Sequence, residues 1–333
     1  MSHIHPSTRR RFAQHLSGLS AMLVGLPGLV AAQTGAALGK IIVGYPAGGT
    51  LDQTARRLAD VWRSQGKTYV VDNRPGAAGR IANGQLKRER ADGSVMLCTH
   101  TSALTIYPHV YTKLGYDAAA DFRPVTPVAA ATCAFAISTA VPDSVKTLAD
   151  YVRWAKANSA GNSYASPAAG SLAHFLGYRF DQAAGLKFTH VPYRGSAPAM
   201  QDLLGGQIPA YMGFVADFLQ YVGTGKLRML AVTGERRSRF MGHVPTFAEQ
   251  GYGTVVGTET YGLFVPPQTP DAALAALSDA ARSAHMDSAL VSGLEQTGLE
   301  AIFMSPTEYG QLIAREREAW RPIVAASGFK SEE

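Results

Sequence analysis

Residues 40–52 read KIIVGYPAGGTLD, a short apolar run followed by a glycine-containing loop and the start of a helical pattern. The run at 40–43 is typical of a buried strand, and apolar residues recur at helical spacing from 50 to 64. Thr50 and Gln53 fit a capping box, in which each side chain bonds the other residue's backbone N–H. The stretch therefore predicts a strand, a loop at its carboxyl end and a helix.

The same alternation of strands and helices extends along the chain. We expect strands at 69–71 and 95–99, separated by a turn at 73–76 and a helix to about residue 90. After residue 144 the pattern restarts, with helices expected at 145–158, 171–185 and 196–204 and strands at 162–165, 188–191 and 227–233. A strand at 261–265, a helix from 270 and a long helix after the sequence SPTE at 305–308 follow.

This alternation predicts an α/β fold of two lobes, each a mainly parallel sheet flanked by helices. No polar linker separates the two parts, so we expect strands to join the lobes. We assign residues 39–137 and 256–333 to lobe 1, and residues 138–255 to lobe 2.

The first 32 residues have the pattern of an export signal. A start with three arginines at 9–11 precedes a broken apolar stretch at 16–30, and Val30-Ala31-Ala32 supplies small residues for cleavage after Ala32. The arginines before Phe12 fit a twin-arginine signal as well as an ordinary secretory leader. The mature protein is therefore expected in the periplasm.

The composition excludes several classes of protein. The chain has 333 residues, of which 46% are hydrophobic, and this content excludes a disordered chain. The net charge of +6 includes the three leader arginines, and the rest holds 28 Lys and Arg against 25 Asp and Glu. With no basic stripe interleaved with aromatic residues, we expect no nucleic-acid partner.

The two cysteines, Cys98 and Cys133, both lie in apolar, strand-like runs. Two buried thiols are the preferred interpretation, and a disulfide in an oxidising compartment is the alternative. No Cys-x-x-Cys occurs, so neither a zinc site nor a redox site is predicted.

Known catalytic motifs are missing from the sequence. It has no Gly-x-Ser-x-Gly, no His-Glu-x-x-His and no Walker loop, and the spacing in the loop at 44–49 is wrong for a dinucleotide fingerprint. The histidines after the leader show no ligand-like spacing. We therefore predict no catalytic residue, no metal and no cofactor.

Two loops, one in each expected lobe, lie between a strand and a helix. Gly48 and Gly49 precede the helix that begins at Thr50, and the sequence YASPAAGS at 164–171 precedes the helix at Leu172. The free N–H groups and partial positive charge of a helix N-terminus attract carboxylates. Ligands of open α/β sheets lie at such strand ends. Either loop could also be only a tight turn, but together they favour a clamp for an organic anion.

Nine short segments in order carry a family resemblance. They are YPAGGTLD at 45–52 with AR at 55–56, DNRPGAAG at 72–79, ADG at 91–93, LGYDAAADFRPVT at 114–126, YAS at 164–166 with His174, HVPYRGSAP at 190–198, DLLGGQ at 202–207, VPT at 244–246 and YGLF at 261–264. With them the chain resembles the Bug, or TctC-like, solute-binding proteins of tripartite tricarboxylate transporters, from about residue 41 to residue 329.

The resemblance implies a two-lobe binding protein whose cleft closes on a small carboxylate. Carried over to this sequence, the ligand-binding positions are Tyr45, Ala47, Gly49, Thr50, Asp52, His100, Thr101, Ser166, Ala169, Gly170 and Ser171. We add Gly48 of the first loop, Phe214, and Asp217, which lies one helical turn later, to the expected ligand-binding residues. For Asp52, a role in complementing the helix dipole is the alternative. The segment at 73–76 is more simply a structural turn, and His174 more simply a packing residue.

Departures from the family pattern bear on the ligand. Pro167-Ala168-Ala169 replaces a polar run, and an acidic position of amino-acid-binding members falls on Gly213, beside Phe214. The missing acid argues against a ligand ammonium group. Tyr45, Tyr107 and Phe214 make the expected cleft aromatic, so we expect a carboxylate with an apolar or aromatic body.

The resemblance also implies partners. We expect a monomer that delivers its ligand to the membrane permease subunits of the transporter. An exported sensor component that presents its ligand to a membrane kinase is the alternative, and an α/β enzyme is a third and weaker interpretation. The sequence does not identify the carboxylate.

Overall fold

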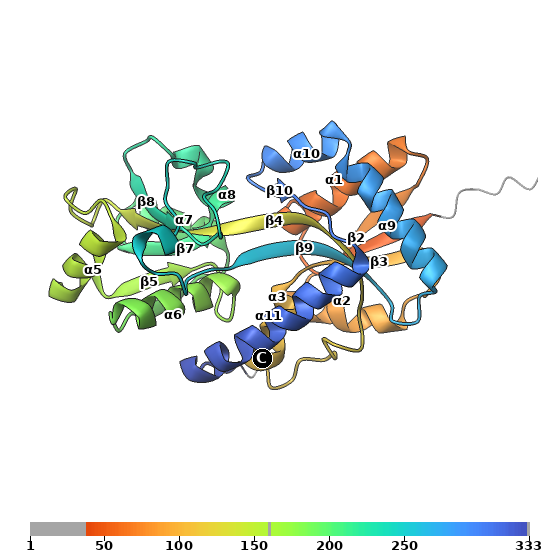
Figure 1. Cartoon of the computed structure of the whole chain (residues 1–333), viewed down its shortest axis with the longest axis horizontal. Helices are drawn as coiled ribbons and strands as arrows, with labels where there is room; N and C mark the ends of the chain where they lie inside the picture. The colour runs from red at the N-terminus through yellow and green to blue at the C-terminus, as the bar shows by residue number, and fades with distance from the viewer. Residues whose placement is uncertain (1–37, 159–160, 332–333) are drawn as a thin grey trace, which may run out of the picture. The chain divides into compact units, whose positions relative to one another are not determined.

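The structure is a computed structural model that describes residues 38–158 and 161–331 (Figure 1). The export signal predicted for residues 1–32 lies outside the described residues. None of the helices in the described part combines the length and the apolar character that crossing a bilayer requires.

Ten strands of the described chain form one mixed sheet that runs through two lobes. In the first lobe, β1 (Gly39–Val43) pairs in parallel with β2 (Tyr69–Asn73) and β3 (Val95–His100). Three further strands add antiparallel pairs: β9 (Thr258–Val265), β4 (Arg123–Ser138) and the short β10 (Glu300–Ala301). The first-lobe helices include α1 (Thr50–Ser64), α2 (Arg80–Gln85), α9 (Asp271–His285) and α10 (Ser288–Glu295).

The second lobe uses the end of the same long strand. Antiparallel to β4 lie β7 (Ala210–Phe214) and β8 (Leu227–Val232), and β7 continues in parallel to β5 (Ser163–Ser166) and β6 (Thr189–Pro192). The helices are α5 (Leu148–Ala157), α6 (Leu172–Ala184), α7 (Ser196–Leu204) and α8 (Val215–Phe218). The two-lobe α/β fold predicted from the sequence is confirmed.

The expected parallel pairing holds only for the outer strands. Every pair that includes β4 or β9 is antiparallel, and these two strands run next to each other between the two lobes (Figure 1). The strand-like run expected around Cys133 is the second part of β4, which begins earlier, at Arg123. No strand was predicted at β7.

The sheet is buried on both faces, which explains its continuous apolar runs. In β1, Ile41 and Val43 belong to the core beneath α1, α9 and α10, whereas Ile42 belongs to the core on the opposite face. In β4, Phe135 packs with the core of α5 and α6, and Ala134 packs with the core of α7 and α8. Side chains that alternate along a strand thus bury both faces.

The last helix, α11 (Pro306–Ser327), begins with the predicted start signal. Ser305 and Glu308 form a capping box, and Pro306 takes the first helical position. Tyr309 belongs to a first-lobe core, and Trp320 belongs to the core that contains α5 and α6. The helix thereby contributes to the cores of both lobes.

Cys98 on β3 and Cys133 on β4 are fully buried and unpaired, so the interpretation as two small buried thiols is confirmed. Burial raises the pKa of both thiols, that of Cys98 to about 12. Neither is a reactive thiolate near neutral pH.

Candidate functional site

The loop between β1 and α1 leaves backbone donors free at the start of the helix. The N-cap of α1 is Gly49, with no side-chain cap, so the predicted capping box at Thr50 is wrong. Gln53 instead donates its side-chain amide to the Gly48 carbonyl at 2.7 Å, and its N–H is the first bonded within the helix, to Gly49. The N–H groups of Thr50 and Leu51 thus precede the helix bonds and have no acceptor in the described chain.

The buried carboxylate of Asp52 stabilises this loop through hydrogen bonds. Its side chain is buried and accepts the N–H of Gly48 at 2.8 Å, Nε of Arg56 at 2.9 Å and Nδ2 of Asn73 at 2.8 Å. Gly48 has a φ of +84°, a backbone conformation that favours glycine, and this turns its N–H towards Asp52. Burial raises the Asp52 pKa, but the three hydrogen bonds outweigh it and lower the pKa below its ordinary value. These contacts give Asp52 a structural role in the loop.

Tyr45 and His100 lie side by side beneath the loop. The Tyr45 hydroxyl donates to the Ala78 carbonyl at 2.9 Å and lies 2.6 Å from Nε2 of His100. Because the single phenolic proton is committed to Ala78, we assign the proton between the two side chains to Nε2. Burial lowers the pKa of His100 to about 4, so the ring is neutral at neutral pH. Its buried Nδ1 has no partner in the described chain.

The second loop uses most of its polar groups on itself. The Ser171 hydroxyl donates to the Ala168 carbonyl at 2.7 Å and accepts the N–H of His174 as the cap of α6. The N–H of Gly170, whose φ is +74°, donates to Nδ1 of His174 at 3.0 Å. The Ser166 hydroxyl bonds Nε2 of His190 at 2.8 Å. These internal hydrogen bonds leave the second loop with fewer free donors than we expected from the sequence.

A cavity of about 380 Å³ lies between the two loops. Six of the predicted ligand-binding residues line it: Tyr45, Gly49, Thr50, His100, Ser171 and Phe214. Eight others do not: Ala47, Gly48, Asp52, Thr101, Ser166, Ala169, Gly170 and Asp217. Further lining residues are Pro46, Leu51, Ser102, Tyr107, Pro167, Ala168, Glu259 and Tyr261.

Two of the residues outside the cavity wall have internal partners. Asp217 accepts hydrogen bonds from the Phe214 N–H at 3.0 Å, the Ser196 hydroxyl at 2.9 Å and the Tyr211 hydroxyl at 3.2 Å. Its contacts fix the turn from β7 into α8, and burial raises its pKa. The Thr101 hydroxyl is buried and donates to the Thr260 carbonyl at 3.0 Å.

Sequence reasoning missed one ionisable residue in the cavity wall, Glu259. It lies between two threonines at the start of the strand sequence TETYGLFV, and an acid next to the predicted strand at 261–265 was the available signal. The Ser102 N–H donates to its Oε1 at 3.0 Å, and the Ser102 hydroxyl donates to its Oε2. Burial raises the Glu259 pKa to about 7, against the lowering effect of these hydrogen bonds. No Lys or Arg lines this cavity within the described chain.

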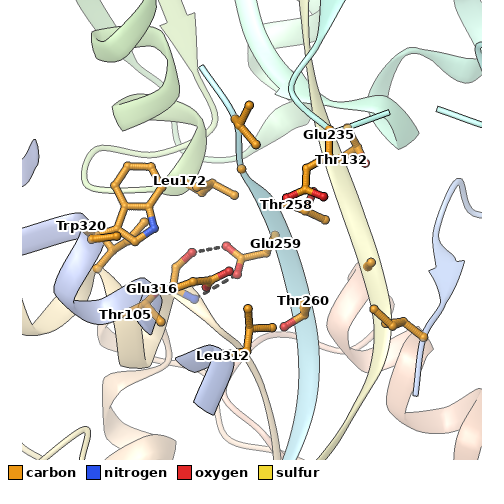
Figure 2. A pocket seen from close by; sticks show the side chains of 18 of the residues that line it. Thr105, Thr132, Leu172, Glu235, Thr258, Glu259, Thr260, Leu312, Glu316 and Trp320 are labelled. Atoms are coloured by element: carbon orange, nitrogen blue, oxygen red, sulfur yellow. Dashed lines mark hydrogen bonds between the residues drawn. The ribbon is translucent and has the colours of Figure 1, made fainter. Parts of the chain in front are cut away.

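A second, larger cavity of about 720 Å³ shares Ser102 and Glu259 with the first (Figure 2). Figure 2 shows Glu316, on α11, beside Glu259, and Thr258 and Thr260 on the neighbouring positions of β9. Burial and the negative charge of Glu259 raise the Glu316 pKa to about 7. Glu259 therefore belongs to the walls of two cavities.

The family model described as the tripartite tricarboxylate transporter family receptor, TctC, matches residues 54–329. The chain belongs to this family. The resemblance drawn from the nine sequence segments is confirmed. The match begins just after the first loop and includes the second loop and Glu259.

Relatives of this TctC-family protein span nearly its whole length. It is 30% identical to the Cupriavidus necator UPF0065 protein in the gbd 5' region, covering 87% of each chain. It is also 30% identical to BugT of Bordetella pertussis, covering 87% of this chain and 89% of BugT. Among solved structures, the periplasmic binding protein BugD superposes with a TM-score of 0.75 at 26% identity, covering 88% of this chain and 98% of BugD. An R. palustris protein solved with adipate superposes with a TM-score of 0.78 at 27% identity, covering 88% of this chain and 98% of that protein.

Proposed function

We propose that this TctC-family protein is an exported solute-binding protein that captures a small carboxylate with an apolar or aromatic body for a tripartite tricarboxylate-type transporter. The observation that carries the proposal is the combination of free N–H groups at the start of α1 with a cavity wall of aromatic and apolar side chains.

The start of α1 supplies the chemistry for the carboxylate end. Gly49 and Thr50 are exposed and line the cavity, so an anion can reach the N–H groups of the first helical turn. The helix N-terminus carries about half a positive charge, which stabilises a carboxylate without a Lys or Arg. This arrangement suits a cavity that has no cationic side chain in its described wall.

Much of the remaining cavity wall suits an apolar body. Tyr45, Tyr107, Phe214 and Tyr261 supply aromatic surface, and Leu51 supplies aliphatic surface. Burying about 100 Å² of apolar ligand surface there would contribute about 2.5 kcal/mol. We expect a dissociation constant in the micromolar range, which corresponds to a binding free energy of about −8 kcal/mol.

The relatives support the carboxylate and the compartment. The R. palustris structure contains adipate, a carboxylate, and BugD is a periplasmic binding protein. The family is one of transporter receptors, which agrees with a binding role rather than catalysis.

A thermal-shift screen of the protein without residues 1–32 tests the proposal. The panel contains aliphatic monocarboxylates, dicarboxylates, aromatic carboxylates and amino acids. A ligand at 100 times its dissociation constant adds about 2.7 kcal/mol of stability, which raises the melting temperature measurably. Stabilisation by α-amino acids alone would contradict the apolar body, and stabilisation by no carboxylate would contradict the proposed function.

Thr50→Pro tests the role of the helix start directly. Proline is tolerated at the first helical position, and Gly49 has the extended backbone that precedes proline, so the variant removes one N–H and keeps the helix. Losing a hydrogen bond to a charged group costs about 1.5–3 kcal/mol. We expect the best carboxylate of the panel to bind at least about tenfold more weakly, measured by calorimetry.

Thr50→Ala is the matched control, because it shortens the same side chain and keeps the N–H. We expect it to bind within about threefold of the wild-type protein. Equal losses in the two variants would show that the Thr50 side chain, and not the backbone donor, contacts the ligand.

A further inference from the structure

We infer that Glu259 is a specificity-determining residue, which disfavours a second carboxylate on the ligand and favours an ammonium or hydroxyl group at the end remote from the anchored carboxylate. This inference rests on the proposed function, because it takes the start of α1 as the site of the first carboxylate. It adds a property that distinguishes this chain from a receptor for dicarboxylates.

The lining residues of the cavity differ in exposure to solvent. Gly49, Thr50 and Ala168 are exposed, so the loop residues form its rim. Ser102 and Glu259 are each only 4% exposed and are among its most buried lining residues. A ligand whose carboxylate binds at the rim therefore directs its other end towards Glu259.

Glu259 has no cationic partner. The described chain places no Lys, Arg or His nitrogen within 4.0 Å of its carboxylate. Its partners are uncharged: the N–H and hydroxyl of Ser102, helped by the backbone N–H groups of Thr101 and Thr260. Burying a charged carboxylate without a countercharge costs free energy, because the group loses its hydration, unless hydrogen-bond donors replace the lost water. A donor on the ligand would provide that compensation, and a second carboxylate would increase the cost.

The charged groups on the far side of Glu259 do not neutralise it. Those lining the second cavity are Arg179 on α6, Glu235, Arg236 and Arg237 after β8, Glu300 on β10 and Glu316 on α11. Arg236 pairs with Glu300 at 3.6 Å, and Arg237 pairs with Glu249 at 2.9 Å. Arg179 lies over the Trp320 ring, 6.0 Å from its centroid, and forms no ion pair with Glu259. Glu316, beside Glu259 in Figure 2, adds negative rather than positive charge.

On the ligand side, the other titratable groups are neutral at neutral pH. These are His100, whose pKa burial lowers to about 4, and Tyr45, Tyr107 and Tyr261, whose pKa values burial raises. Because burial raises the Glu259 pKa to about 7, its negative charge develops around neutral pH. The discrimination between ligands should therefore increase from pH 6 to pH 8.

Matched ligands of four to eight carbons test the inference by calorimetry. At each length an alkanoate, the corresponding ω-amino acid and the corresponding α,ω-dicarboxylate differ only at the remote end. At pH 8 we expect the wild-type protein to bind the dicarboxylate at least about tenfold more weakly than the alkanoate, since two close negative charges repel strongly in a buried site. In Glu259→Gln this ratio should fall to about threefold or less, and the ω-amino acid should lose at least about tenfold in affinity.

Glu316→Gln is the matched control, because it removes the neighbouring charge but its residue lines only the second cavity. We expect this variant to keep the wild-type affinities of the alkanoate, the dicarboxylate and the ω-amino acid relative to one another. Glutamine at 259 keeps an acceptor for Ser102, and circular dichroism and the melting temperature verify the fold of each variant.

The outcomes separate this inference from the proposed function. If alkanoates bind but Glu259→Gln leaves both ratios unchanged, or changes only the melting temperature, Glu259 is a structural link between β9 and Ser102 and the inference is wrong. If the wild-type protein prefers dicarboxylates, it is also wrong. If no carboxylate of any class binds, the proposed function itself fails.

Discussion

Asp52 is the single residue on which the geometry of the first loop depends most. Its two oxygens accept hydrogen bonds from Gly48, Arg56 and Asn73, and the Asn73 amide also bonds the Tyr45 carbonyl at 3.0 Å. The carboxylate thus ties the loop to α1 and to the end of β2. Its contacts explain why the loop keeps the start of α1 free.

Asp52→Asn should lower the free energy of unfolding at pH 7 by about 2 kcal/mol, because it weakens bonds to a buried carboxylate. Since the folded-state pKa of Asp52 is lowered, its stabilising effect is complete above the ordinary value of 3.8 and is lost as the pH falls through the folded-state pKa. Urea denaturation at pH 7 and at pH 3 measures both effects, and the difference between variant and wild type should shrink at pH 3.

Asp60→Asn serves as the control on the same helix. Asp60 pairs with Arg63 at 2.9 Å, but both side chains are more than half exposed, so the pair contributes little. A loss as large as that of Asp52→Asn would contradict the structural role given to Asp52.

The second loop depends on an element, the first turn of α6. His174, buried in this turn, accepts the Gly170 N–H and stacks on His190 with ring centroids 3.8 Å apart. Burial lowers the His174 pKa to about 3, helped by His190, and burial lowers the His190 pKa to about 4. Only the neutral His174 ring can accept the Gly170 bond. The sequence interpretation of His174 as a packing residue agrees with these contacts.

Acid should therefore destabilise this element. The folded state holds both rings neutral, whereas the unfolded chain protonates them near pH 6.5, so stability falls as the pH falls below 6.5. We expect the melting temperature to decrease from pH 7.5 to pH 4.5, and His174→Gln to show a shallower decrease. His243→Gln, at an exposed position, should keep the wild-type slope. Identical slopes in all three proteins would exclude His174 as the cause.

At the scale of the whole molecule, β4 joins the two lobes. It pairs with β9 and β10 in the first lobe and with β7 and β8 in the second. Its side chains enter the cores of both lobes, as do those of α11. Neither lobe can lose its core without disturbing a strand that the other lobe needs.

The two lobes should consequently unfold in one transition. Trp62 lies in a first-lobe core, and Trp154 packs against a second-lobe core, so each reports on one lobe. In the variants Trp154→Phe/Trp320→Phe and Trp62→Phe/Trp320→Phe, the remaining tryptophan should give the same urea midpoint as circular dichroism of that variant. Fluorescence midpoints that differ from the circular-dichroism midpoint would indicate lobes that unfold independently.

Features that depend on neighbours within a few residues could be predicted from the sequence alone. The capping box of Ser305 and Glu308, the helical face of α1 and the apolar runs of β1 and β3 are local patterns, and they were predicted correctly. The ordered segments also identified the family, and the two loops located four residues of the cavity wall, Tyr45, Gly49, Thr50 and Ser171.

Which polar groups face the cavity, and which form hydrogen bonds within the protein, depends on the three-dimensional fold. Asp52 and Gly170 belong to the predicted loops, but partners in the fold take up their polar groups. Glu259 and Tyr261 arrive on β9, more than 200 residues after the first loop, through antiparallel pairing with β3 and β4. Such pairing is fixed by the packing of the whole chain, because hydrogen bonds between distant strands leave no local signal in the sequence.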